Sequence, residues 1–194
     1  MNKPVLGILG GIFNPVHYGH LSVASMARDH FNLDKLLFIP SGTAPHKENV
    51  TVSPQHRVKM LSYALSDFEK GEIWEGEIER NGYSYTVDSL KIIEQIFPDR
   101  EYLYVIGSDN LKEIKSWRDY KTILKMVTLC VAHRPGYQDE IPDYLSGAKI
   151  VTIPSPNWGL SSSMLRDYLR KGLSCQYLVP NDVLRYIKKN NLYV

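Results

Sequence analysis

Short apolar runs alternate along the chain with longer stretches in which apolar residues recur at helical spacing. The apolar runs predict strands over residues 5–9, 35–39, 72–79, 101–106, 127–132 and 149–153. The longer stretches predict helices over residues 21–31, 53–68, 86–97 and about 180–190. Strands that alternate with helices in this way form parallel sheets, in which right-handed helical crossovers join the strands. The pattern therefore predicts an α/β fold with a doubly wound, mostly parallel sheet.

Length, composition and charge narrow the class of protein. With 194 residues the chain has the size of one domain, and we expect a small helical C-terminal part at about 161–194. An apolar content of 43% and a charged content of 23% are ordinary for a globular protein in water. The net charge of +2 is too small to indicate a nucleic-acid or membrane partner. No apolar run is long enough to span a bilayer and no signal-peptide pattern occurs, so we expect a cytoplasmic location.

The stretch from Gly10 to His20 is the densest candidate for chemistry. It joins the first predicted strand to the first predicted helix, and Gly10 and Gly11 allow a sharp bend and a close approach of a ligand. The start of the helix offers N–H groups and the positive end of its dipole, which together favour phosphate. His17 and His20 are three residues apart, so both imidazoles can face one ligand and donate to its oxygens. The alternative is that one histidine caps the helix and the other lies on the surface. A zinc site is disfavoured because no third ligand has suitable spacing.

This stretch resembles the GGxFxPxHxGH motif of the nucleotidyltransferase superfamily, whose H-x-G-H pair contacts the phosphates of a nucleoside triphosphate. A second stretch, residues 160–166 (LSSSMLR), places three serine hydroxyls at a predicted helix start and an arginine one turn later, which suits another anion. It resembles the superfamily's I-S-S-T-x-I-R motif, which clamps the triphosphate opposite the H-x-G-H turn. A capping serine cluster is the alternative, but capping accounts for one serine rather than three. The resemblance implies a Rossmann-like nucleotidyltransferase fold over the single domain, with ATP bound by Gly10, Gly11, Phe13, His17, His20, Ser161, Ser162 and Arg166.

Residues 107–109 (GSD) follow directly after a predicted strand. Gly107 permits a close backbone approach, and Asp109 at the carboxyl end of a strand can accept hydrogen bonds from both hydroxyls of a ribose. The alternative role for Asp109 is the N-cap of the next helix. The corresponding G-x-D run of the family contacts the ribose and adenosine groups, so the resemblance implies that Gly107 and Asp109 also bind ATP.

Two further segments are similar to those of the bacterial nicotinate mononucleotide adenylyltransferases. The loop over 40–47 resembles that family's P-P-H-K loop, with Ala44 in place of the first proline, and residues 84–90 resemble its S-Y-T-x-D-T-L run. Thr86 in the second segment can also act simply as a helix cap. The helix predicted over 53–68 lies between the two segments, and its apolar stripe indicates no chemistry.

Trp117 and the segment 134–136 continue the same resemblance. The family has Trp-Tyr at the first position, where Arg118 replaces the tyrosine here, and it has R-P-G at the second. A tryptophan suits stacking on a flat pyridine ring, and an arginine fork suits a phosphate. The resemblance implies that nicotinate mononucleotide is bound by His46, Lys47, Thr86, Trp117 and Arg134.

Together these likenesses imply adenylyl transfer from ATP to nicotinate mononucleotide, which gives deamido-NAD and pyrophosphate in NAD biosynthesis. The sequence offers no plausible nucleophile in this set, so we expect the mononucleotide phosphate to attack the α-phosphorus directly. The catalytic groups His17, His20 and Arg166 then act by positioning and by charge stabilisation. Mg²⁺ is expected to assist the leaving pyrophosphate and to be held mainly by ATP, without protein side-chain ligands.

Several alternatives stay open. The acceptor could be nicotinamide mononucleotide, or both mononucleotides, because the sequence does not locate the donors that would recognise a nicotinate carboxylate. Another acceptor such as phosphopantetheine is disfavoured, since Thr86, Trp117 and Arg134 stand in family register. A nucleotide-binding sensor without turnover belongs to a different class. A homo-oligomer is also left open.

Overall fold

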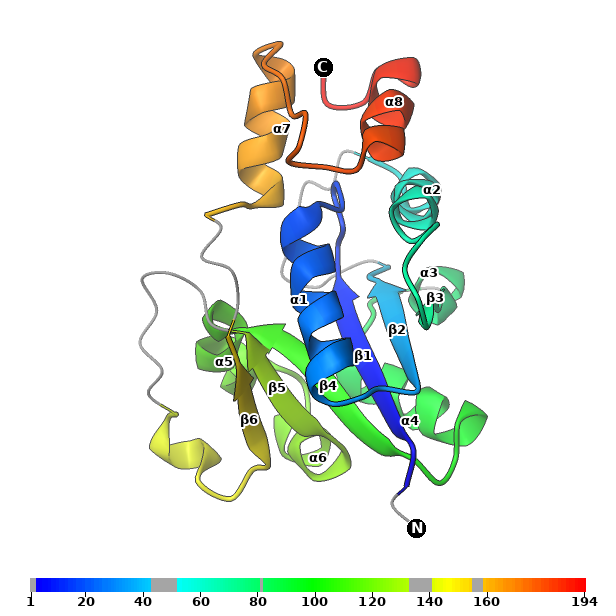
Figure 1. The fold of residues 1–194 in the computed structure, drawn as a ribbon. Helices are drawn as coiled ribbons and strands as arrows, with labels where there is room; N and C mark the ends of the chain where they lie inside the picture. Colours follow the sequence, from blue (N-terminus) through cyan, green and yellow to red (C-terminus); the bar gives the residue numbers. More distant parts are fainter. Residues whose placement is uncertain (1–2, 43–51, 81, 133–140, 155–158) are drawn as a thin grey trace.

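The apolar runs pair as the strands of one parallel sheet. The protein is described by a computed structural model over residues 3–42, 52–80, 82–132, 141–154 and 159–194 (Figure 1). Six strands lie in the order β3-β2-β1-β4-β5-β6, and every neighbouring pair is parallel. They are β1 (Val5–Gly11), β2 (Lys35–Pro40), β3 (Gly71–Ile73), β4 (Glu101–Gly107), β5 (Thr128–Ala132) and β6 (Ile150–Ile153). The predicted α/β fold with a parallel sheet is confirmed.

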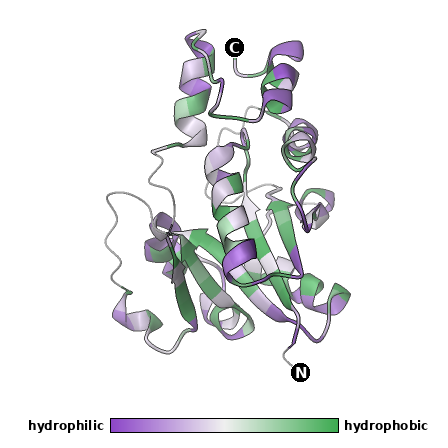
Figure 2. Cartoon of the chain, viewed as in Figure 1, coloured by the Kyte–Doolittle hydropathy of each residue, from purple (hydrophilic) through white to green (hydrophobic). Residues whose placement is uncertain are grey.

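Helices cover both faces of this sheet (Figure 1). The α-helices are α1 (Tyr18–His30), α2 (Pro54–Ala64), α3 (Gly76–Glu79), α4 (Thr86–Ile96), α5 (Ser108–Glu113), α6 (Tyr120–Met126), α7 (Ser162–Arg170) and α8 (Asn181–Lys189). Two short 3₁₀ turns are η1 (Ile114–Ser116) and η2 (Asp143–Leu145). Figure 2 shows that the strands are mostly apolar and that the helices carry both polar and apolar residues, as expected when strands are buried on both faces.

Two hydrophobic cores arise because successive residues of a strand point to opposite faces. Phe38 and Val105 belong to the core under α1, α2, α7 and α8. Their neighbours Leu37 and Tyr104 belong to the core under α4, α5 and α6. The strand order reverses between β1 and β4, and ligands of open α/β sheets bind beyond the carboxyl ends of the strands at such a point.

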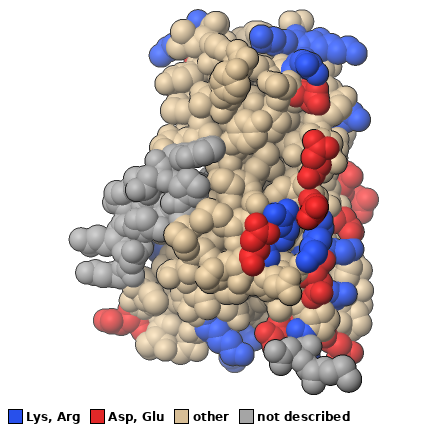
Figure 3. Space-filling view, in the orientation of Figure 1, with Lys and Arg blue, Asp and Glu red and all other residues tan. Residues whose placement is uncertain are grey.

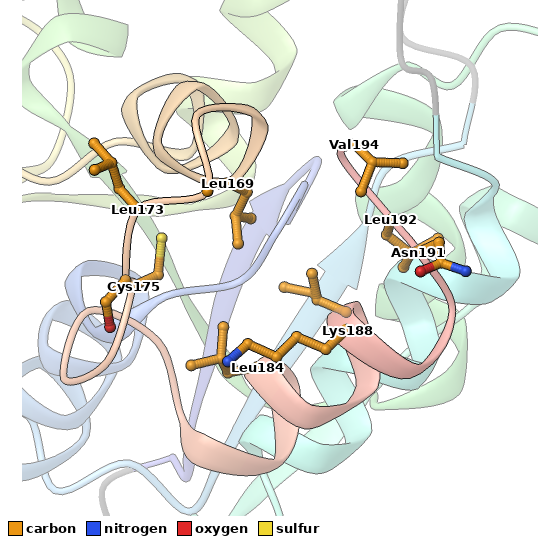
Figure 4. Close-up of a pocket in the computed structure, with 11 residues that line it drawn as sticks. Leu169, Leu173, Cys175, Leu184, Lys188, Asn191, Leu192 and Val194 are labelled. Carbon is orange, nitrogen blue, oxygen red and sulfur yellow. The ribbon is translucent and has the colours of Figure 1, made fainter.

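The helices α7 and α8 lie beyond these carboxyl ends (Figure 1). The Tyr186 hydroxyl of α8 lies 2.8 Å from Nδ1 of His56, which attaches α8 to α2. A cavity of about 340 Å³ lies between α7 and α8, with Leu169 on one side and Leu184 on the other (Figure 4).

Two predicted elements differ from the structure. The strand predicted over 72–79 ends at Ile73, and the short helix α3 follows. The alternation of acidic and apolar residues there suggests a strand, but Glu77 and Glu79 lie in a first helical turn, where acidic side chains favour the helix dipole. The helix predicted over 53–68 ends at Ala64, and Arg57 lies on its buried face beside the apolar residues.

The surface carries charges of both signs. Figure 3 shows basic side chains at the end where α8 lies and mixed signs lower on the same face, which agrees with the small net charge. None of the helices in the described ranges combines the length and the apolar character that a membrane span requires.

Candidate active site

A cavity of about 980 Å³ opens at the carboxyl ends of β1 and β4, where the strand order reverses. β1 contributes Gly10 and Gly11 to its wall, and β4 contributes Gly107. Further wall residues come from the β1–α1 turn, the start of α4, the α5–η1 region and the start of α7, and Ser41 and Glu77 also line the cavity. Segments that are far apart in sequence therefore meet around one space.

The turn between β1 and α1 presents two histidines to this cavity. His17 is the N-cap residue of α1 and is 2% exposed, and the rings of His17 and His20 stack with their centroids 3.7 Å apart. The backbone N–H of His17 donates to Nδ1 of His20 at 3.3 Å. The proton of a neutral His20 ring therefore lies on Nε2. The alternative of a cap and a surface histidine is half right, because His17 is the N-cap residue but His20 lines the cavity.

Phe13 fixes the backbone that leads into these histidines. Its φ of 51° lies in the left-handed region, which is unusual for a bulky residue. The ring is buried, and its centroid lies 5.1 Å from that of His20 and 6.2 Å from that of Phe38. This packing holds Phe13 in a conformation that an isolated chain rarely adopts.

The start of α7 closes the cavity on the side opposite the histidines. The Ser161 hydroxyl accepts from the backbone N–H of Met164 at 3.2 Å and so caps the helix. The Ser162 hydroxyl donates to the carbonyl of Pro15 at 2.9 Å, and Nη1 of Arg166 donates to the carbonyl of Asn14 at 2.9 Å. These two bonds bring the positive end of α7 against the histidine turn, where it favours an anion.

The C-terminal segment braces the same turn. The Tyr193 hydroxyl donates to Oδ1 of Asn14 at 2.6 Å, and both side chains are buried. Burial raises the pKa of Tyr193, so its hydroxyl stays protonated and remains a donor at neutral pH. Asn14 thus connects the turn to both α7 and the segment after α8.

Aromatic and hydroxyl side chains form the far side of the cavity. The rings of Tyr104 and Trp117 meet edge to face with centroids 6.0 Å apart. Thr86 lies within hydrogen-bonding reach of the Tyr104 phenol, whose pKa burial raises. The helix α4 begins at Thr86 and its N-cap residue is Tyr85, so the alternative of Thr86 as a cap is wrong.

A buried carboxylate, Glu77, stands behind this far side. The Ser89 hydroxyl donates to Oε1 of Glu77 at 2.6 Å, and Nη2 of Arg80 donates to the Ser89 oxygen at 2.7 Å. The backbone of Gly42 also hydrogen-bonds the carboxylate. Desolvation raises the pKa of Glu77 in spite of these bonds. The cluster links the end of β2 to the start of α4.

Asp109 lines the cavity from the first turn of α5. Gly107 is the N-cap residue of this helix, so the alternative of Asp109 as the cap is wrong. The carboxylate thus lies next to the end of β4, as predicted for a group that meets a ribose.

Gly10 and Gly11 play a different part from the one predicted. Both are the last residues of β1 rather than residues of a sharp bend. A Cβ on Gly10 would lie 2.7 Å from the Tyr104 hydroxyl, and one on Gly11 would lie 3.3 Å from the Phe13 ring. The missing Cβ atoms make room for the protein's own side chains, while both backbones still line the cavity.

A family model accounts for most of the chain. Residues 8–168 match the model described as cytidylyltransferase-like. The chain belongs to the cytidylyltransferase-like family.

Curated relatives narrow the assignment within this family. A chain from Desulfitobacterium hafniense (strain Y51) is 37% identical over 97% of this chain and 95% of its own length. A chain from Lactococcus lactis subsp. lactis (strain IL1403) is 36% identical over 99% of this chain and 96% of its own. Both carry the name "Probable nicotinate-nucleotide adenylyltransferase". The predicted resemblance to that family is confirmed.

Solved structures share the fold. The Plasmodium falciparum nicotinic acid mononucleotide adenylyltransferase complexed with NaAD superposes with a TM-score of 0.81 at 21% identity, covering 98% of this chain and 97% of that one. The same enzyme complexed with APC gives a TM-score of 0.79 at 22% identity, with the same coverage.

The cytidylyltransferase-like fold brings most of the predicted site residues to the one cavity. Those that line it are Gly10, Gly11, Phe13, His17, His20, Thr86, Gly107, Asp109, Trp117, Ser161, Ser162 and Arg166. His46, Lys47 and Arg134 lie outside the residues that the structure describes. The substrate that each residue contacts stays a prediction.

Sequence reasoning missed several residues of the cavity wall, among them Asn14, Tyr104 and Glu77. Asn14 lies inside the glycine-histidine stretch but at a position that the motif leaves open. Tyr104 is hidden in an apolar strand, and Glu77 in a run where acidic residues alternate with uncharged ones. A tyrosine in a central strand is a weak indication of a nearby polar site, because its phenol must find a polar partner when it is buried.

Proposed function

We propose that this family member transfers the adenylyl group of ATP to nicotinate mononucleotide, giving deamido-NAD and pyrophosphate as a step of NAD biosynthesis. The observation that carries the proposal is that one cavity joins an anion-binding half to an aromatic half. Stacked histidines and a helix start form the first half, and Tyr104 and Trp117 form the second. Relatives at 36–37% identity carry the name of this activity, which supports the choice of substrates.

In this proposal the triphosphate of ATP lies between the histidine turn and α7. Nε2 of His20 donates to the α-phosphate, and His17 and Ser162 hold the same chain of phosphates. Arg166 uses one of its five N–H donors on Asn14, so the fork is held in place while other donors meet phosphate oxygens. Gly107 and Asp109 receive the ribose.

The chemical step is a direct displacement. A phosphate oxygen of the mononucleotide attacks the α-phosphorus of ATP and forms a new P–O bond, while the bond from the α-phosphorus to the bridging oxygen breaks and pyrophosphate leaves. No covalent intermediate with the protein forms. The side chains lower the barrier by orienting the reactants and by stabilising the charge that develops at the α-phosphate.

The acceptor occupies the aromatic half. Its pyridine ring stacks on Trp117, and Thr86 lies beside the ring. His46, Lys47 and Arg134 meet its anionic groups. An edge-to-face Tyr104 holds the tryptophan ring from behind, so the stacking face is formed before the substrate arrives.

Mg²⁺ is the metal ion that we propose for this reaction. In the described part of the chain, no group of three or more His, Cys, Asp or Glu side chains could hold a metal. The residues that meet the phosphates are imidazoles, hydroxyls and an arginine, which are poor Mg²⁺ ligands. This donor set fits an ion held by phosphate oxygens and water, and the ion would neutralise charge on the leaving pyrophosphate.

We also propose that residues 1–194 form one nucleotidyltransferase domain, with the small helical part at about 161–194 completing the ATP half. The bonds from Ser162 and Arg166 to the β1–α1 turn support this, because they make α7 part of the cavity wall. The domain works in the cytoplasm on small-molecule substrates, without nucleic acid or membrane.

Pyrophosphate release tests the proposal. The purified chain is incubated with ATP, Mg²⁺ and either nicotinate or nicotinamide mononucleotide at equal concentration, and the dinucleotide is quantified by chromatography. We expect one pyrophosphate per deamido-NAD, with the nicotinate form reacting faster, and no release when the mononucleotide is omitted. An equal or faster reaction with nicotinamide mononucleotide would contradict nicotinate mononucleotide as the preferred acceptor. ATP binding without pyrophosphate release would indicate a sensor.

A further inference from the structure

Arg57 is a buried cation that joins two loops of the active site. It lies on the inner face of α2 and is 1% exposed. Nη1 donates to the carbonyl of Ile12 and Nη2 to the carbonyl of Ser41, each at 2.8 Å. Ile12 leads into the histidine turn and Ser41 leads into the loop after β2. Both carbonyl-bearing residues line the large cavity.

Burying an arginine in the hydrophobic core costs free energy. Burying a cation is unfavourable unless it is paired, and desolvation accordingly lowers the pKa of Arg57. Within the described ranges, no carboxylate lies at ion-pair distance from it, and Nε has no hydrogen-bond partner. An apolar side chain of similar volume would pack at this position with less desolvation. The guanidinium therefore has a use that apolar packing does not supply.

The geometry shows what that use is. β1 and β2 are neighbours, and the backbone N–H of Ser41 already donates to the carbonyl of Gly11 at 2.9 Å. The register of β1 and β2 ends at Gly11 and Pro40, and the described residues of the two segments that follow show no further strand pairing. The planar fork of Arg57 then provides two donors with fixed separation, one for each departing chain.

We propose that Arg57 is a positioning residue for both substrates: it fixes the histidine turn and the loop after β2 relative to each other, so that ATP and its acceptor meet at reacting distance. This inference rests on the proposed function, which assigns ATP to the first loop and the acceptor to the second. Arg57 itself touches neither substrate. Its charge adds positive potential behind the turn that receives the phosphates.

Two variants separate the fork from the charge. Arg57→Lys keeps the charge and loses the planar fork, and Arg57→Met keeps much of the volume and loses both. Lys59→Met on the exposed face of the same helix is the matched control, since the Lys59 ammonium lies over the exposed Tyr63 ring, away from the cavity lining. Melting curves establish that each variant is folded at the assay temperature.

We expect the KM for ATP and the KM for the mononucleotide to rise together in both Arg57 variants, with kcat/KM reduced by about 10²-fold, because a displacement of about 1 Å can cost that much. Compared with Arg57→Met, Arg57→Lys should regain part of the loss for ATP only, because its charge lies behind the turn that receives the phosphates of ATP. Lys59→Met should resemble the wild type. A residue that only stabilised the fold would lower the melting temperature and leave both KM values unchanged in the folded protein.

Calorimetry with a non-hydrolysable ATP analogue and, separately, with nicotinate mononucleotide measures the same effect without turnover. Weaker binding of both ligands to Arg57→Lys supports the proposal. Unchanged binding, a change for one ligand alone, or failure of both variants to fold would overturn it. If the wild type binds both ligands but releases no pyrophosphate, the proposed function fails while the role of Arg57 is still decided by these affinities.

Discussion

Replacing His20 by alanine removes one hydrogen-bond donor from the ATP half of the cavity. The structure shows what else is lost. The ring of His20 stacks on that of His17 at 3.7 Å and meets the edge of Phe13 at 5.1 Å, and Nδ1 accepts one backbone N–H at 3.3 Å. The last contact is long, so its loss costs at most about 1 kcal/mol of folding free energy.

These magnitudes separate catalysis from folding. A loss of about 1 kcal/mol lowers the melting temperature by roughly 2–4 °C in a chain of this size. Removing a donor that stabilises charge in the transition state costs about 10²–10³ in turnover. His20→Ala should therefore melt within a few degrees of the wild type and yet release pyrophosphate about 10²–10³-fold more slowly under saturating ATP and mononucleotide.

Two amide variants test which nitrogen matters. The amide nitrogen of His20→Gln reaches the place of Nε2 and can donate to phosphate, whereas the amide of His20→Asn reaches only the place of Nδ1. We expect partial recovery of turnover in the glutamine variant and none in the asparagine variant. His30→Ala, at the exposed other end of α1, is the control. A folded His20→Ala that keeps turnover within a few-fold of the wild type would refute the role of His20.

Three further predictions concern buried polar groups. Tyr193→Phe leaves Oδ1 of Asn14 without its 2.6 Å donor, so urea unfolding should show a loss of about 1–3 kcal/mol, and an unchanged midpoint would contradict the brace. Burial raises the pKa of Glu77 above its usual 4.5. Above pH 4.5 the unfolded chain is ionised there while the folded chain keeps its proton, so the stability of the wild type falls as pH rises towards the raised pKa. Glu77→Gln lacks this titrating group, so its free energy of unfolding should rise relative to that of the wild type as the pH increases over this range. If the two curves of stability against pH run parallel, the pKa of Glu77 does not change on folding. Burial raises the pKa of the Cys130 thiol to about 12, so iodoacetamide at pH 8 should modify it in urea and leave it intact in the native protein, as mass spectrometry of the digested chain would show.

The sequence predicts which residues of the glycine-histidine and serine stretches come together, because the parts of each stretch are local. The glycine-histidine stretch and the serine stretch each follow a strand and open a helix, so the chemistry and the structure that presents it lie within a few residues. Only the parallel sheet is then needed to bring both helix starts to one edge. The predicted bend at Gly10 is wrong for the opposite reason, since the Tyr104 hydroxyl that fills the space comes from another strand and leaves no local sign.

Residues that act through distant backbone are not predictable in this way. The partners of Arg57 lie 45 and 16 residues away, and nothing in the sequence of α2 distinguishes this arginine from one at the edge of an amphipathic face. The carboxylate of Glu77 similarly meets Ser89, twelve residues on, and the backbone of Gly42. The role of both residues can be recognised only from the packing, which shows that an ionisable side chain is buried.

Substitutions in the two halves of the cavity should have different effects on turnover and on KM. In the proposed reaction the ATP half depends on side chains and helix starts that act on the phosphates, so a change there should lower turnover for every acceptor. The proposal gives the aromatic half the acceptor ring, and Trp117 and Thr86 in that half belong to separate elements, η1 with its following residue and α4. Substitutions there should alter the KM for the mononucleotide and leave that for ATP in place. Arg57 joins the backbones of Ile12 and Ser41, and Glu77 joins Ser89 to the backbone of Gly42, so each residue connects separate segments around the cavity.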